Sequence, residues 1–465
     1  MLKEEFRKGF KDILVSRKFG PEIEGILFDP KTPFDVPSVE KLASFFDNIA
    51  MKHHNLSLVY EELLIDNKVV SNFPTGVKMY LNNYGIDITT DMSRCTFEVT
   101  IPPSGLMEKL EINVKEILEI VLKGAEDTGL VVLGLGCHPF AKRSFENVMP
   151  KRRYKLMGTR FQEEELLGLS ISAATQAHVE INKAESGKIL NILNGFVPVL
   201  IASASNSTII EARTSEYKAY REIAWDEHTS KGSIEKERVG IPMIFTDLNS
   251  YFDYLVDQRM IISKRHFGED STYVLFGKDT PRVSEFVNTN KAVVYRMDDG
   301  QTAIVSPNIE DIRFLEGTVW PDVRLRSRFG TAEFRACDFQ PSTEEILAIV
   351  SALKGVVRNS ERAAHVLEGY TLNEIKLARE SAVKEGLSGR IRDLEMSRFA
   401  ERMIGIAAEG LESSEKRFLL PIIRNIEEKK SPADRTRAFF RNELKGGIRT
   451  ASDITRFVDR HKFKI

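Results

Sequence analysis

Acidic, amide and imidazole side chains recur at alternate positions in three short segments that are otherwise apolar. They are Glu22 and Glu24 in the first segment, Glu98 in the second, and Gln176 and His178 in the third. Successive side chains of a β-strand point to opposite faces, so each set shares one face and the apolar residues share the other. Carboxylates with an imidazole are suitable ligands for Mg²⁺ or Mn²⁺. The pattern therefore indicates a sheet whose polar face binds a metal ion.

For any one of these strands, the alternative is an antiparallel sheet with one face in water, which shows the same alternation. Exposed faces usually mix lysine, threonine, serine and arginine, whereas the polar positions of these three segments contain no lysine. Burying carboxylates without partners is energetically costly. A sheet whose polar face lines a binding site resolves that conflict.

A fourth segment, residues 319–336, supplies the opposite charge. Its charged residues near the end include Arg324, Arg326, Arg328, Glu333 and Arg335. The first three have one parity and the last two have the other, so a single continuous strand would place the two sets on opposite faces. We predict a bulge or turn at residues 329–330 that resets the register. Guanidinium groups beside carboxylates suit a phosphate with its metal ion, and the alternative is a surface ladder of Arg–Glu pairs.

The overall charge argues against two classes of partner. Lys and Arg total 66 and Asp and Glu total 68, which gives a net charge of -2 over 465 residues. This balance gives no electrostatic reason to expect a nucleic-acid or membrane partner. Cys95, Cys137 and Cys337 cannot all pair with one another and show no CxxC spacing, which favours a reducing compartment. The first residues are charged and show no signal peptide, so we expect a soluble cytoplasmic protein.

Helical and extended patterns alternate over the first 340 residues. Expected helices lie at 2–16, 37–50, 106–128, 183–203, 211–227 and 246–258, and expected strands at 22–28, 56–65, 129–135, 170–182, 292–296 and 319–336. The long uncharged run at residues 189–210 contains Pro198 and several Asn and Ser residues, which favours a buried helix and a polar loop over a membrane span. Interspersed strands and helices predict an α+β fold.

After Pro341 the pattern is helical alone. Segments with helical periodicity lie near 343–358, 371–384, 389–408, 412–428 and 449–461. Short breaks rich in Gly, Ser or Pro separate them. We therefore predict an α+β sheet domain over residues 1–340, which would carry any catalytic site, and a C-terminal helical subdomain over residues 341–465 that packs on it.

Several familiar catalytic motifs are absent from the sequence. There is no GxxxxGK[ST] loop, no HExxH, no GxSxG and no zinc-ligand spacing. The run from Gly134 to Pro139 fails the dinucleotide pattern because Pro139 stands where the third glycine should be. If the protein uses ATP, it does so without a Walker loop.

Six segments, in this order, resemble those of the type 2 glutamate–cysteine ligases, also called carboxylate–amine ligases, of the glutamine synthetase-like superfamily. They are Glu22–Glu24, Cys95–Val99, Gly136–Ala141, Gln176–Val179, Ser203–Ser207 leading to Arg213 and Tyr220-Arg221, and Trp320–Asp338. The last is the most specific, and the resemblance runs from about residue 20 to 390. It implies a glutamine synthetase-like fold with a curved, mostly antiparallel sheet flanked by helices. It also implies an ATP-dependent ligase that converts the γ-carboxylate of glutamate to an acyl phosphate, which an amine attacks.

The resemblance also implies roles for particular residues. The implied metal ligands are Glu22, Glu24, Glu98, Glu333 and His178, and the implied catalytic residues are Arg324, Glu333 and Arg335. The implied ATP-binding residues are Gln176, His178, Arg213, Arg221 and Arg335. Arg335 would contact the transferred phosphoryl group, and Arg324 the glutamate or a phosphate. Arg213 and Arg221 fall at family arginine positions, and either could instead be an ordinary helix-surface residue.

The expected cofactors are ATP and Mg²⁺ or Mn²⁺. The expected substrates are glutamate and an amine, with cysteine the leading candidate and glutathione biosynthesis the implied context, and a homodimer is left open. Divalent ions bridge phosphates and stabilise the charge that develops during phosphoryl transfer, which agrees with the residues described above.

The sequence departs from the family at several positions. Cys137 stands where many members have threonine, Gln176 where many have histidine, and Lys384 where arginine is common. Residues 264–318 form a longer stretch than in the compact bacterial members, whereas Pro321–Arg324 resembles the cysteine-ligase branch. The reaction type is thus better supported than the amine. The alternatives are a ligase for another amine, a guanidino kinase-like phosphotransferase, and a non-catalytic relative that binds nucleotide or glutamate.

For several other candidate residues we expect structural rather than functional roles. His53-His54 is expected to be a helix cap or surface pair, Trp225 part of a helix core, and Cys95 and Cys337 packed thiols. The run Lys151–Tyr154 could reach a nucleotide phosphate or form a solvated loop.

Overall fold

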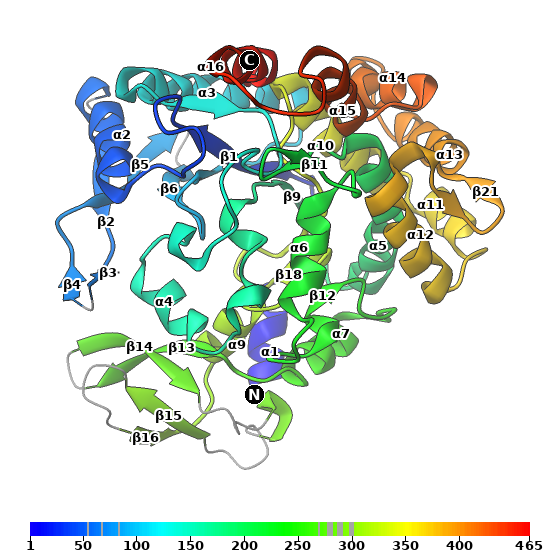
Figure 1. Ribbon diagram of the computed structural model, residues 1–465. Helices are drawn as coiled ribbons and strands as arrows, with labels where there is room; N and C mark the ends of the chain where they lie inside the picture. Colours follow the sequence, from blue (N-terminus) through cyan, green and yellow to red (C-terminus); the bar gives the residue numbers. More distant parts are fainter. Residues whose placement is uncertain are drawn as a thin grey trace.

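A curved antiparallel sheet organises the molecule (Figure 1). The computed structural model describes residues 1–53, 55–66, 68–81, 84–267, 270–276, 282–285, 292–296 and 302–465. Within them, nine strands form one sheet in the order β18-β19-β9-β1-β7-β6-β5-β2, with β8 paired to β1. Their bounds are β1 Phe19–Phe28, β2 Ser57–Tyr60, β5 Pro74–Leu81, β6 Tyr84–Thr90, β7 Thr96–Thr100, β8 Val131–Leu133, β9 Thr175–Glu180, β18 Val323–Arg326 and β19 Thr331–Phe334. The predicted α+β class with a mostly antiparallel sheet is confirmed.

The three strands with alternating polar residues are neighbours in this sheet. β1 pairs with β7 on one side and with β9 on the other. Ile23, Val99 and Val179 are fully buried on the apolar side. The polar residues of three separate segments therefore share one continuous surface.

The fourth charged segment is a hairpin rather than one strand. β18 pairs with β19 so that Arg324 lies opposite Glu333. The chain turns at Gly330, whose φ of 66° is left-handed and favours glycine. This turn places Arg324 and Glu333 side by side, and it confirms the irregularity predicted at residues 329–330.

In the described part of the chain, helices cover the apolar face of the sheet. They are α3 (Met107–Thr128), α10 (Thr343–Arg358) and α2 (Val39–Lys52), which packs beside α3 and over β5, while α5 (Ser186–Ala204) contacts β18 and β19 at the edge of the sheet. α10 contacts both β1 and β9. Because these helices occupy one face, the polar face of β1, β7 and β9 is left to form a site.

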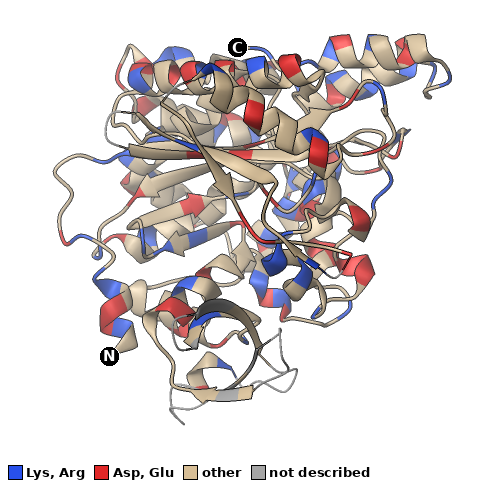
Figure 2. Ribbon diagram, turned by 90° about the vertical axis from the view of Figure 1, so that its left-hand side faces the viewer, with Lys and Arg blue, Asp and Glu red and all other residues tan. Residues whose placement is uncertain are grey.

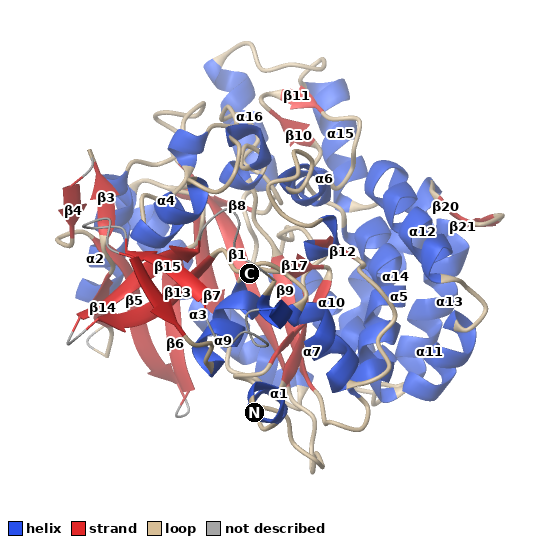
Figure 3. Cartoon of the chain, turned by 90° about the horizontal axis from the view of Figure 1, so that it is seen from below, coloured by secondary structure: helices blue, strands red, loops and turns tan. Residues whose placement is uncertain are grey.

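Five C-terminal helices of the described chain gather on one side of the molecule around α5 (Ser186–Ala204), as Figures 1 and 3 both show. They are α11 (Ser360–Leu367), α12 (Leu372–Glu385), α13 (Met396–Glu409), α14 (Leu420–Glu428) and α15 (Pro432–Glu443). The last helix, α16 (Ala451–His461), lies away from α5, and Lys462 directly after it pairs with Leu133 of β8. A short hairpin, β20 (Arg390–Ile391) with β21 (Leu394–Glu395), interrupts the five helices, so the prediction of helices alone was wrong at that point. The division near residue 340 stays a prediction.

The long uncharged run forms the buried helix α5, as predicted. In the described part of the chain, α5 is long and apolar enough to cross a membrane, but 89% of its apolar window is buried in the protein. Figure 2 shows acidic and basic residues interspersed along the outer helices, in keeping with the balanced net charge.

Smaller elements surround the polar face. They are α1 (Leu2–Arg7), β3 (Leu63–Ile65), β4 (Lys68–Val70), α4 (Arg152–Gly158), β10 (Ile209–Ile210), β11 (Arg213–Thr214), α6 (Tyr220–His228), β12 (Val239–Gly240), α7 (Leu248–Val256), α9 (Ile309–Gly317) and β17 (Trp320–Pro321). A second sheet joins β13 (Ile262–Phe267), β14 (Asp270–Phe276), β15 (Ala292–Arg296) and β16 (Thr302–Val305) in sequence order. It packs on α4 and α9, within the stretch that the sequence marked as long.

Two predicted helices are shorter than expected. α1 ends at Arg7 rather than residue 16, because the backbone at Gly9 lies against the carbonyl group of Ser327, where a side chain would clash. α6 begins at Tyr220 rather than residue 211, since the preceding residues form the β10–β11 hairpin. In both cases contacts between distant segments override local helical periodicity.

Candidate active site

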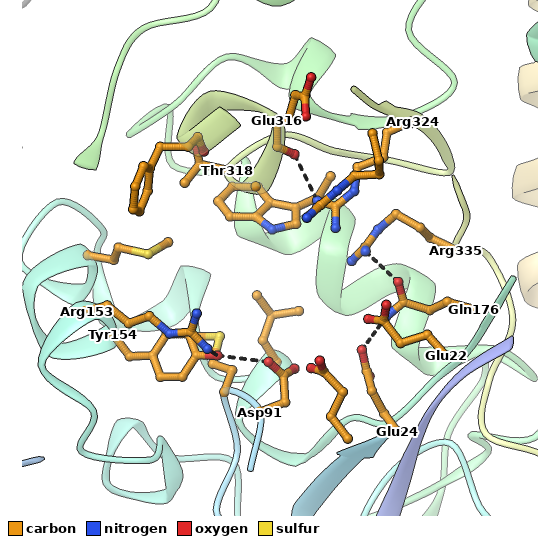
Figure 4. Close-up of a pocket in the computed structure, with 18 of the residues that line it drawn as sticks. Glu22, Glu24, Asp91, Arg153, Tyr154, Gln176, Glu316, Thr318, Arg324 and Arg335 are labelled. Carbon is orange, nitrogen blue, oxygen red and sulfur yellow. Dashed lines mark hydrogen bonds between the residues drawn. The ribbon is translucent and has the colours of Figure 1, made fainter. Parts of the chain in front are cut away.

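A cavity of about 750 Å³ lies on the polar face of the central sheet (Figure 4). Its walls come from β1, β7, β9 and β18, from the loop after β6, and from α4, α6 and α9. Figure 4 shows Glu22, Glu24 and Asp91 together on one side and Arg324 and Arg335 on another, with Arg153 near Asp91 and Glu316 near Arg324. Carboxylates and guanidinium groups thus face one shared space.

Three carboxylates meet on the floor of the cavity. Glu22, Glu24 and Glu98 each place one oxygen within 4.8 Å of the others. The sheet register explains this, because Glu24 lies directly opposite Glu98. A fourth carboxylate, Asp91, lines the cavity from the loop after β6, and sequence reasoning missed it because it belongs to no alternating strand.

Crowding changes the acidity of this cluster. Burial, followed by the charge of Asp91, raises the pKa of Glu24 to about 7. Desolvation raises the pKa of Glu98 well above its ordinary value, and the neighbouring charge of Glu22 adds to the effect. Like charges held this close disfavour joint ionisation. Hard oxygen donors that gain from a neutralising cation fit a divalent metal ion such as Mg²⁺.

Two polar residues of β9 connect the cluster to its surroundings. The Gln176 side-chain amide donates a hydrogen bond to Glu24, and its oxygen accepts one of 2.6 Å from Arg335. His178 Nε2 lies 3.2 Å from a Glu22 oxygen, and its Nδ1 lies 3.0 Å from the Thr331 hydroxyl. Gln176 thus bridges the acidic and basic parts of the cavity.

Glu333 lies among arginines. Arg324 donates two hydrogen bonds of 2.9 Å to its two oxygens, and Arg335 donates a third. Burial alone would raise the pKa of Glu333, but Arg324, Arg335 and Arg326 hold it well below its ordinary range. Glu333 is 1% exposed and lies outside the cluster of Glu22, Glu24 and Glu98. Its predicted role as a metal ligand stays a prediction.

Aromatic rings line the cavity beside the arginines. Trp225 stacks on Trp320 with ring centroids 5.6 Å apart, and the Arg335 guanidinium lies 5.7 Å from the Trp225 ring. Trp225 is half-buried: it packs against the main hydrophobic core, as predicted, and it also lines the cavity beside Arg335, which the prediction did not include. Trp225 lies on the face of α6 that borders the cavity. Helical periodicity alone did not show which face of the helix borders the cavity.

The run Lys151–Tyr154 is buried or half-buried rather than a solvated loop, and its last two residues, Arg153 and Tyr154, line the cavity. Lys151 is buried and donates a hydrogen bond of 2.7 Å to the Thr90 carbonyl. Arg153 donates to the Tyr154 hydroxyl, which in turn donates to Asp91 at 2.9 Å. Figure 4 shows Tyr154 beside Asp91 at the cavity wall. The helix thus orients the fourth carboxylate.

The remaining candidates fall in different places. Arg221 is buried and lines the cavity, whereas Arg213 is exposed in β11 and is not part of the lining. Lys384 is exposed and pairs with Glu216. His53 caps the C-terminal end of α2, in line with the prediction, and its neighbour at position 54 is outside the described residues.

The prediction that Cys95 and Cys337 are packed thiols is confirmed. Cys95 and Cys337 are buried free thiols, and burial raises the pKa of Cys95 to about 11. A thiol of that acidity is protonated at neutral pH and is a poor nucleophile.

Comparison with known proteins agrees with this geometry. Residues 18–453 match the family described as glutamate-cysteine ligase family 2. The chloroplastic glutamate–cysteine ligase of Medicago truncatula is 23% identical over 357 residues, covering 73% of this chain and 65% of the relative. A putative glutamate–cysteine ligase 2-3 of Mycolicibacterium smegmatis is 21% identical over 318 residues, covering 67% of this chain and 70% of the relative. The chain thus spans about 65% of the length of the plant relative.

A solved structure shows the same fold. The glutamate–cysteine ligase of Francisella tularensis, determined in complex with AMP, superimposes with a TM-score of 0.53 at 12% identity. The match covers 97% of this chain and 90% of that one. At this identity the likeness concerns the fold, and it agrees with the α+β fold with a mostly antiparallel sheet that the family resemblance implied.

Proposed function

The chain belongs to glutamate-cysteine ligase family 2, and from this membership and its cavity we propose that it is an ATP-dependent ligase that forms a γ-glutamyl amide. In the proposed reaction, a γ-carboxylate oxygen of glutamate attacks the γ-phosphorus of ATP, which gives γ-glutamyl phosphate and ADP. The nitrogen lone pair of an amine then attacks the acyl carbon, phosphate leaves with the C–O bonding electrons, and the amine loses a proton. With cysteine as the amine, the product is γ-glutamylcysteine.

The observation that carries this proposal is the pairing of acidic and basic groups across one cavity. Glu22, Glu24 and Glu98 offer oxygen ligands, and Arg324 and Arg335 face the same space. Guanidinium groups match the oxygens of phosphates and carboxylates. A divalent ion held by the carboxylates would neutralise the phosphate oxygens of the bound nucleotide. Both kinds of group are needed for a reaction that transfers a phosphoryl group from ATP to a carboxylate.

The proposed roles follow the positions of the side chains. Glu22, Glu24 and Glu98 hold the metal ions, and Asp91 joins them from the loop after β6. Arg335 stabilises the transferred phosphoryl group, since it approaches the carboxylate cluster through Gln176. Donors fixed before the reaction stabilise developing charge without reorganisation.

Three further assignments complete the proposal. His178 and Gln176 lie toward the nucleotide, and Arg324 binds the glutamate or a phosphate. Glu333 joins the metal ligands only if one of its arginines moves to a substrate, because both of its oxygens accept from arginines in the free protein. Arg213 has no part in the proposed site. A cytoplasmic location and a homodimer stay predictions.

The decisive experiment measures ADP release from ATP and Mg²⁺ by the purified protein, with L-glutamate and a panel of amines led by L-cysteine. Release that needs both glutamate and cysteine, with γ-glutamylcysteine detected by mass spectrometry, supports the proposal in full. Release that needs another amine keeps the mechanism and changes the substrate. A stable phosphorylated product formed without any amine favours a phosphotransferase. ATP binding without turnover in any combination favours a non-catalytic binding protein.

A further inference from the structure

Arg379 reaches from α12 in the C-terminal helices to the structure that surrounds the cavity. Its side chain is 5% exposed and meets three carboxylates. Arg379 Nε and Nη2 donate to the two oxygens of Asp322 at 2.6 and 3.2 Å, Nη2 donates to Glu222 at 3.0 Å, and Nη1 lies 3.2 Å from an Asp226 oxygen. One guanidinium thus joins a strand connection to two positions of α6.

Each of the three residues that carry these carboxylates is connected to Arg335, directly or through one neighbouring residue. The Asp322 carbonyl accepts the backbone N–H of Arg335 at 2.8 Å. Glu222 accepts a hydrogen bond of 2.7 Å from Arg221, whose guanidinium also donates to the Arg335 carbonyl at 3.1 Å. The backbone of Arg335 is therefore held on one side by Asp322, which Arg379 binds directly, and on the other by Arg221, which Arg379 reaches through Glu222.

The third carboxylate, that of Asp226, is connected to the side chain of Arg335 through the neighbouring Trp225. Asp226 directly follows Trp225 in α6, and the Trp225 ring lies beneath the Arg335 guanidinium, 5.7 Å away. An Asp226 held by Arg379 fixes the rotation of α6 at this point and hence the place of the ring. A planar guanidinium suits this task because its five N–H groups leave in fixed directions, which a lysine cannot reproduce.

We propose that Arg379 is a positioning residue for Arg335, which links the C-terminal helices to the phosphoryl-transfer site. The inference rests on the proposed function for its effect on turnover, but the contacts that define it are independent of that function. Arg379 itself does not line the cavity, so it acts through Asp322, Glu222 and Asp226.

The test is a double-mutant cycle on ADP release. We expect Arg379→Lys to lower kcat by about tenfold or more and to leave the KM for ATP and glutamate within about twofold, since it displaces a group needed mainly in the transition state. In the Arg335→Lys background, Arg379→Lys should add little further loss, because residues that act through one group are not additive. The matched control is Arg392→Lys, an exposed arginine paired with Glu374 beside the same helix, which should keep wild-type kinetics.

Wild-type kcat in Arg379→Lys overturns the inference, and so does a loss of the same size in both backgrounds, which would indicate a general structural role. If Arg379→Lys does not fold, Asp226→Asn replaces it in the cycle, since the Asp226 side chain is 41% exposed and makes one of the three links.

A second readout separates this inference from the proposed function. In a Trp320→Phe background, Trp225 is the single tryptophan of the chain, and Arg379→Lys should shift its emission relative to that background and to Arg392→Lys. An unchanged emission contradicts the inference even if the wild type shows no ligase activity. An inactive wild type with a shifted emission contradicts the proposed function and supports the positioning of α6.

Discussion

Glu24 and Glu98 lie directly opposite each other on the neighbouring strands β1 and β7, with their carboxylates on the cavity side. Together with Glu22 they form a cluster whose charges repel. Desolvation and this repulsion raise the pKa of both groups, that of Glu24 to about 7. The cluster therefore carries an electrostatic cost that a divalent cation can offset.

The stability of the metal-free protein should fall as pH rises through this region. The pKa of Glu24 rises from about 4.5 to about 7 on folding, so between these values the folded state binds more protons than the unfolded state. The free energy of unfolding then decreases with pH across that window. Mg²⁺ competes with those protons, so we expect it to raise the Tm more near pH 8 than near pH 5.5. Thermal unfolding with Mg²⁺ or with EDTA at several pH values checks this.

The control for that experiment is Glu98→Gln, which removes one charge with little change of shape. It should weaken the pH dependence of the metal-free protein and reduce the Mg²⁺ effect. A Mg²⁺ effect that is equal at all pH values, or that persists fully in Glu98→Gln, would place the metal elsewhere.

Glu333→Gln should destabilise the protein. Glu333 is buried and accepts hydrogen bonds from Arg324 and Arg335, so the substitution leaves buried guanidinium charge uncompensated, at a cost of about 3–5 kcal/mol. Urea unfolding measures the change in free energy of unfolding. Glu401→Gln, which breaks an exposed pair with Arg398, is the control and should have little effect. Equal stability of Glu333→Gln and the wild type would show that the ion pairs around Glu333 contribute nothing net.

Arg335→Lys should lower turnover by about tenfold or more, because the lysine ammonium cannot reproduce the planar fork of the guanidinium. The same substitution at exposed Arg398 is the control. Steady-state ADP release at saturating ATP and glutamate gives kcat for both variants. Unchanged kcat in Arg335→Lys would assign Arg335 a structural role in the ion-pair network.

Tyr154→Phe should weaken Mg²⁺ binding by about tenfold, since the hydroxyl that orients Asp91 is lost and such supporting hydrogen bonds tune metal affinity. Titration calorimetry with Mg²⁺ in the presence of a non-hydrolysable ATP analogue measures the affinity. Tyr60→Phe, at a half-exposed tyrosine outside the cavity lining, provides the comparison. Equal affinities in all three proteins would exclude Asp91 from the metal site.

The sequence by itself determined the core of the site. A strand alternates its side chains with a period of two, so the shared face of Glu22 and Glu24, and that of Gln176 and His178, follow from local geometry alone. The turn near Gly330 was predictable for the same reason, because the parity of the charged residues required a change of register.

Only the tertiary structure decided which other side chains join them. Asp91 lies in the loop between β6 and β7, and Tyr154 and Trp225 lie on short helices. Arg379 lies on α12 and is far from the strands in sequence. Their directions depend on how each element packs, and no local period encodes that. The same holds for Glu333, whose carboxylate could serve a metal or an arginine, and which packing places among arginines. The alternation within strands is fixed by neighbouring residues, whereas the meeting of loops and helices is fixed by long-range burial.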